Sequence, residues 1–183
     1  MNELLVATGH VIRGLEVILL VYLVLKFKSR SWSLFFGGKG SLKTPSDHEV
    51  HSCFISALCV LVFHFFSGSL APYIVSIDGM EKLELRQFFY FSMLMSSVAF
   101  ATALFFLHVI RGCKFSAVAR YCLYITFAMM LLQTTQFVLR GMLDINSFSP
   151  VYKISVMILN VLSLMVVSMY PISKIAKLRA REV

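Results

Sequence analysis

Long apolar stretches separated by short polar segments dominate this chain. Five such stretches lie at about 4–26, 52–75, 88–110, 118–139 and 152–172. Each is about the 20 residues that a helix needs to cross about 30 Å of hydrocarbon. Lipid cannot satisfy a bare backbone, so a spanning segment must be a helix or part of a closed barrel, and these stretches lack the alternation of barrel strands. The pattern predicts an all-α, polytopic membrane bundle of five transmembrane helices forming one domain, 1–183.

The first stretch is the least uniformly apolar of the five. Its early part carries His10, Arg13 and Glu16, which recur at every third position. Such residues are solvated in the headgroup region or face a protein or water interior, because charge in lipid is costly. The alternative to five spans is therefore four spans with an interfacial N-terminal helix.

Composition supports a lipid-solvated chain. Of the 183 residues, 58% are hydrophobic and 14% are charged, with a mean hydropathy of +0.82, whereas apolar residues make up a little under half of a soluble domain. The bilayer is thus the first expected partner.

The net charge of +8 is explained by the placement of Lys and Arg. Short cytoplasmic loops carry the excess of these residues, and the excess here falls in the segments on one side of five crossings, mainly the loop 27–50 and the tail 173–183. The N-terminus is therefore expected outside and the C-terminus in the cytoplasm of a bacterial inner membrane. No basic and aromatic interleaving points to direct nucleic-acid binding. The residues expected to contact anionic lipid or a soluble partner are Lys26, Lys28, Arg30, Lys39, Lys43, Lys174, Lys177, Arg179 and Arg181.

Polar side chains inside the apolar stretches are the candidate functional residues. Arg13 and Glu16 are close enough on one helix face to pair, and His64 is a candidate proton relay or partner for Glu16. Gln133 and Gln136 are expected to hydrogen-bond between helices, with Asn160 as a partner. Each of these residues has two possible roles. One is helix packing or solvation, and the other is to line an ion path or pore.

Small residues mark a candidate packing face in the third stretch. Ser92, Ser96, Ala99 and Ala103 are spaced by four, three and four residues, which lets two helix backbones approach closely. The partner helix belongs either to the same chain or to a second copy.

Catalytic and metal-binding templates are not visible. The segment 47–53 gathers His48, His51 and Cys53, but zinc sites usually need three or four ligands and no second cluster completes the set. No Walker loop, nucleophile elbow or HExxH motif occurs. We expect a non-enzyme with no cofactor and no metal.

Three functions remain open at this point. The first is a homo-oligomeric membrane subunit that anchors, or signals to, a soluble cytoplasmic protein through its basic loop and tail; class analogy suggests a sensor in a bacterial antiviral defence system. The second is a pore-forming, holin-like effector lined by the polar faces of the first and fourth helices. The third is a small transporter.

Overall fold

The computed structural model describes residues 2–26 and 42–182, with side chains at 6–25 and 42–173. Within these residues the chain is all helical, as the sequence predicts, and has no strand. The helices are α1 (Asn2–Lys26), α3 (Pro45–Val75), α4 (Lys82–Arg111), α5 (Ala117–Gln136), the short π-helix η3 (Phe137–Met142) and α6 (Ser149–Glu182).

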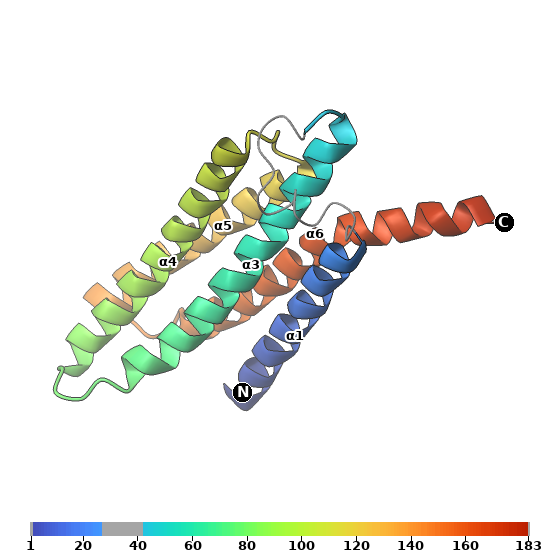
Figure 1. Cartoon of the computed structure of the whole chain (residues 1–183). Coiled ribbons are helices and arrows are strands. Elements are labelled where there is room, and N and C mark those ends of the chain that lie inside the picture. Colours follow the sequence, from blue (N-terminus) through green and yellow to red (C-terminus); the bar gives the residue numbers. More distant parts are fainter. Residues whose placement is uncertain (1, 27–41, 183) are drawn as a thin grey trace.

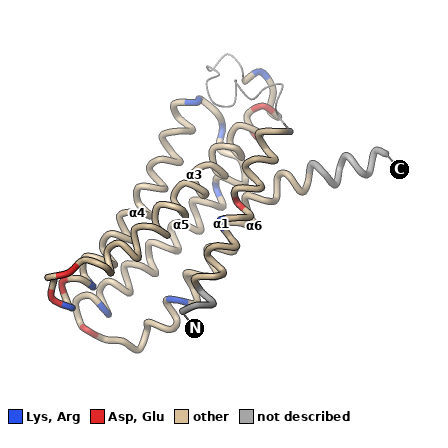
Figure 2. Tube along the Cα trace, turned by 60° about the horizontal axis from the view of Figure 1, so that its bottom comes forward, with Lys and Arg blue, Asp and Glu red and all other residues tan. Residues whose placement is uncertain are grey.

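The prediction of five membrane-spanning helices is confirmed by length and composition. Each of α1, α3, α4, α6 and the α5–η3 unit contains an apolar window long enough to cross a bilayer. Figure 2 shows charged residues gathered mainly towards the helix ends, with long uncharged stretches between them. Large apolar side chains such as Ile18, Phe106 and Ile110 are more than half exposed, as expected where the solvent is lipid rather than water.

The contacts between the helices close into a ring, within which α3 also contacts α5 and α6. Figure 1 shows the long helices lying side by side. Helices that follow one another in the sequence pack side by side, from α1 to α3, α4, α5 and α6, and α6 returns to contact α1. Because α1 packs on both α3 and α6, it belongs to the bundle, which disfavours the alternative of a separate interfacial helix. We call the end with the loops 76–81 and 143–148 the N-terminal end, and the end with the loop 112–116 the C-terminal end.

The core lies in the C-terminal half of the bundle. Its buried side chains come from the first half of α3, the second half of α4 and the start of α5, with Leu104 fully buried at its centre. Val167 and Tyr170 of α6 and Leu23 of α1 complete this cluster. This half of the ring is therefore closed by apolar packing, whereas the N-terminal half is not.

Several helices begin or end at residues other than those that bound the apolar stretches of the sequence. α3 begins at Pro45 rather than at 52, because Thr44 and Asp47 form a capping box that starts the helix within the predicted loop 27–50. α4 begins at Lys82 rather than at 88. α6 begins at Ser149 and continues to Glu182, through most of the predicted tail. Hydropathy locates the part of a helix within lipid, but polar residues can extend a helix beyond it.

Candidate functional site

A cavity of about 380 Å³ lies in the N-terminal half of the bundle, and all five spanning helices line it. Its volume falls within the range of small-molecule sites, about 300 to 1,000 Å³. Its wall combines apolar side chains, including Phe63, Met93 and Phe100, with polar ones. The polar residues in the wall are Thr8, Arg13, His64, Ser67, Ser96, Ser97, Thr126, Gln133, Tyr152, Lys153, Asn160 and Ser163.

Arg13 reaches the cavity from α1, where its guanidinium is held by neutral groups. Its Nε donates to the Gly9 carbonyl (3.2 Å) and its Nη2 donates to His10 Nδ1 (3.1 Å). The guanidinium carbon also lies 5.6 Å from the centre of the Phe65 ring on α3, within the range of a cation–π contact. The pairing of Arg13 with Glu16 that spacing suggests does not form.

Glu16 pairs instead with His64, as one of the sequence hypotheses proposed. The Nδ1 of His64 lies 2.6 Å from Glu16 Oε1, and this contact links α1 to α3. Glu16 is only 2% exposed, and its second oxygen, Oε2, has no hydrogen-bond partner. His64 lines the cavity. The contact with Glu16 therefore helps to hold this part of the cavity wall in place.

Gln133 and Asn160 also line the cavity, but no hydrogen bond joins them. Gln133 is 7% exposed and its carbonyl oxygen Oε1 has no hydrogen-bond partner. A buried polar atom without a partner is rare in folded proteins. Gln133 Oε1 is enclosed by protein atoms, as is the equally unpaired Oε1 of Gln136.

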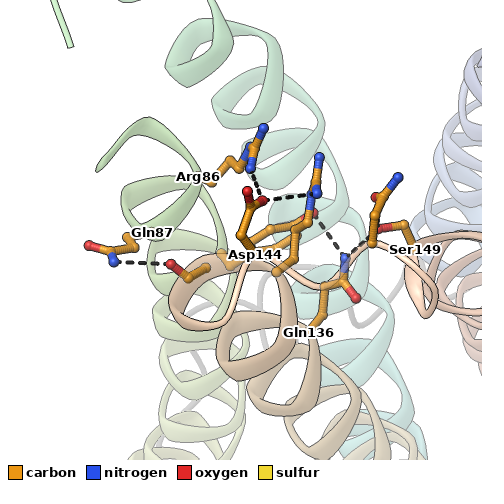
Figure 3. Close-up of polar contacts among 9 residues, drawn as sticks. Arg86, Gln87, Gln136, Asp144 and Ser149 are labelled. Atoms are coloured by element: carbon orange, nitrogen blue, oxygen red, sulfur yellow. Dashed lines mark hydrogen bonds and ion pairs between the residues drawn. The ribbon is translucent and has the colours of Figure 1, made fainter. Parts of the chain in front are cut away.

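Gln136 lies one turn further along α5, nearer the N-terminal end of the bundle. Its side chain joins α4, α5 and α6 (Figure 3). Its Nε2 donates to the Tyr90 hydroxyl on α4 (3.1 Å) and to Ser149 Oγ at the start of α6 (3.0 Å). The expected partnership with Asn160 does not form. Gln136 is fully buried and acts between helices, as the packing interpretation predicts.

The turn that follows η3 completes the N-terminal end. Asp144 adopts a positive φ of 53° and pairs with Arg86 of α4 and with Arg140 of η3 (Figure 3). Gln87 Nε2 donates to the Gly141 carbonyl at 3.0 Å. The π-helix widens the last turn of this span, and these contacts fix it against α4.

A second polar network, which the sequence analysis did not identify, lies in the C-terminal half. Ser52 Oγ lies 2.8 Å from His108 Nε2 and 2.9 Å from Ser116 Oγ, and it accepts the Ser116 backbone N–H at 2.9 Å. His108 Nδ1 donates to the Leu104 carbonyl (2.7 Å), and its ring stacks on Phe115. A serine beside a histidine resembles a nucleophile with its base, but Ser52 is fully buried. The network joins α3, α4 and α5 rather than facing the cavity.

The candidate metal ligands in the segment 47–53 make separate contacts. His48 Nδ1 accepts the Lys114 N–H, His51 contacts the Arg111 guanidinium, and the Cys53 thiol donates to Ser116. Among the described residues, no group of three or more His, Cys, Asp or Glu side chains is placed to hold a metal. All four cysteines are free and buried.

The small-residue positions of α4 do not share one environment. Ser96 is buried and lines the cavity, Ser92 and Ala103 are partly buried, and Ala99 is exposed. Part of this face is thus used inside the chain, and Ala99 lies on the outside of the bundle.

Most of the basic candidates lie outside the described side chains. Lys43 is exposed just before α3. Residues 28, 30 and 39 are outside the described residues, as are the side chains of Lys26 and of the basic positions after 173.

Comparison with family models, with curated proteins and with solved structures returned no match.

Proposed function

We propose that this multi-pass membrane protein binds a small, partly apolar molecule in the cavity of its N-terminal half, as the binding site of a small transporter or receptor. The observation that carries the proposal is the cavity, which is lined by apolar and polar side chains from all five spanning helices. Pockets with an apolar wall and a few convergent polar groups are the usual form of small-molecule sites.

The asymmetry of the bundle supports the same proposal. Apolar packing fills the C-terminal half, whereas the cavity occupies the N-terminal half. A site closed at one end suits a protein that accepts its ligand from one side of the membrane. With the N-terminus outside, as the distribution of Lys and Arg favours, that side is the exterior of a bacterial inner membrane.

A pore formed between copies fits the geometry less well. Glu16, Gln133 and Gln136 are at least nine-tenths buried within one chain, so they are not available to line a channel between copies. Anchoring of a soluble partner, in antiviral defence or elsewhere, depends on the basic loop and tail and remains an expectation from the sequence.

Native mass spectrometry of the protein released from lipid nanodiscs tests the proposal, because it detects a bound molecule of any identity by its mass. Ser97 lines the cavity from α4, and Ala99 is exposed on the same helix. We expect wild type and Ala99→Phe to retain a bound small molecule that Ser97→Phe loses, because the phenyl ring of Ser97→Phe fills the cavity. Equal retention by both variants, or no bound molecule in wild type, contradicts the proposal.

A further inference from the structure

Building on this proposed function, we infer that the cavity selects an amphipathic anion, a carboxylate or phosphate attached to an apolar body, with Arg13 as the countercharge. The anion is either a free amphipathic acid or the headgroup of an acidic lipid, since both present the same chemistry. The argument depends on Arg13 and on the charges in the cavity wall.

Arg13 is a cation in a candidate membrane span, and no carboxylate among the described side chains pairs with it. Among the described residues its contacts are Gly9, His10 and Phe65, and it forms no ion pair. It lies within the candidate span Val6–Leu25 of α1. Charged side chains at such positions usually pair or face a wet cavity and mark functional sites.

The cavity wall carries positive charge. Arg13 lines it, and no Asp or Glu does so among the described side chains. The buried carboxylate of Glu16 on α1 is engaged with His64. A low-dielectric cleft lined by one sign of charge concentrates ligands of the opposite sign, so this wall favours an anion over a cation.

Glycine at position 68 makes room for the guanidinium. A Cβ at this position would lie 2.7 Å from Arg13 Nη1, closer than van der Waals contact allows. Gly68→Ala therefore displaces the guanidinium while keeping its charge. This provides a second way to disturb the anion site without removing Arg13.

Three probes with the same apolar body test the charge preference. 3-Phenylpropionate, 3-phenylpropanol and 3-phenylpropylamine are titrated into wild type in phosphatidylcholine nanodiscs, and the apparent Kd is taken from the rise in unfolding midpoint. We expect 3-phenylpropionate to bind at least about tenfold more tightly than the alcohol, and the amine to bind weakest, because only the carboxylate satisfies Arg13.

Two variants test whether Arg13 causes the preference for the carboxylate probe. In Arg13→Gln and in Gly68→Ala the advantage of the carboxylate falls to about twofold or less, as expected when a charge-assisted hydrogen bond is lost. The matched control is Arg120→Gln, which removes an exposed cation of α5 that does not line the cavity. Equal affinities for the three probes, or a preference that survives both cavity variants, overturns the anion inference and leaves the proposed ligand binding intact.

The source of the anion is tested by the lipid. If the anion is a lipid headgroup, replacing phosphatidylcholine with phosphatidylglycerol raises the unfolding midpoint of wild type but not that of Arg13→Gln. The phosphatidylglycerol then also competes with 3-phenylpropionate for binding to wild type. If it is a free acid, the lipid exchange has no effect and the probe preference persists. If neither lipid nor probe raises the midpoint, the anion inference fails, whereas the native mass spectra judge the proposed function separately.

Discussion

At the residue scale, Glu16 is the most deeply buried acidic side chain in the described part of the chain. Its contact with His64 is the interaction whose loss we expect to cost most. His64→Leu leaves the carboxylate without its partner, which for a buried pair costs about 3 kcal/mol. The measurement is the free energy of unfolding by titration with a denaturing detergent.

His10→Leu is the matched control for this change. His10 is an exposed histidine of α1 that contacts Arg13, so its removal is expected to cost well under 1 kcal/mol. Adding Glu16→Leu to His64→Leu recovers most of the loss, because two apolar residues leave no unpaired charge. A His64→Leu variant as stable as His10→Leu contradicts the importance of the pair.

The same residues show how far sequence reasoning reaches at this scale. It offered the pairing of Glu16 with His64 as one of several roles, because both are polar groups within spans. It did not exclude the pairing of Arg13 with Glu16, since spacing along α1 allows both. The choice depends on the facing helix, where Phe65 and Gly68 receive the guanidinium, and helix packing cannot be derived from spacing alone.

At the element scale, Ser52 is the hydroxyl that holds α3 to α4 and α5. It contacts His108 and Ser116 at once. Ser52→Ala leaves the Ser116 N–H and the ring nitrogen of His108 without this partner inside the bundle. We expect a loss of about 2 kcal/mol in the free energy of unfolding, since each buried polar group left unsatisfied costs about 1 to 3 kcal/mol.

Ser56 provides the control one turn along α3. It is as fully buried as Ser52, but its hydroxyl donates only to the Ser52 carbonyl of its own helix. Ser56→Ala therefore breaks no contact between helices and is expected to cost less than half as much. Equal costs for Ser52→Ala and Ser56→Ala would show that the network does not join the helices.

Helix number and approximate position could be predicted from hydropathy, but helix ends could not. A backbone surrounded by lipid must satisfy its own hydrogen bonds, so each long apolar stretch predicts one helix. Beyond the lipid, the capping box of Thr44 and Asp47 determines where α3 begins. The π-helix 137–142 has no signal in the apolar pattern, because its apolar residues suit an α-helix equally well.

At the scale of the whole molecule, the two halves of the ring differ in how their interior is filled. Leu104 and its neighbours close the C-terminal half, whereas Arg13, His64 and Gln133 border the cavity in the other. Sequence analysis identified these three polar residues but not their convergence. Convergence requires the order of helices around the ring, and this order comes from side-chain packing rather than from hydropathy.

A cysteine introduced into the cavity tests whether it opens to one face only. Ser97→Cys is expected to react with sulfonatoethyl methanethiosulfonate, which does not cross the bilayer, from the face of the N-terminus, because the core around Leu104 blocks the other route. Lys43→Cys, at the opposite end, is expected to react only from the C-terminal face. Native thiols add little background, since all are buried and burial raises the pKa of Cys113 in the loop, which lowers its reactive thiolate fraction. Reaction of Ser97→Cys from the face that labels Lys43→Cys would contradict a cavity closed at its C-terminal side.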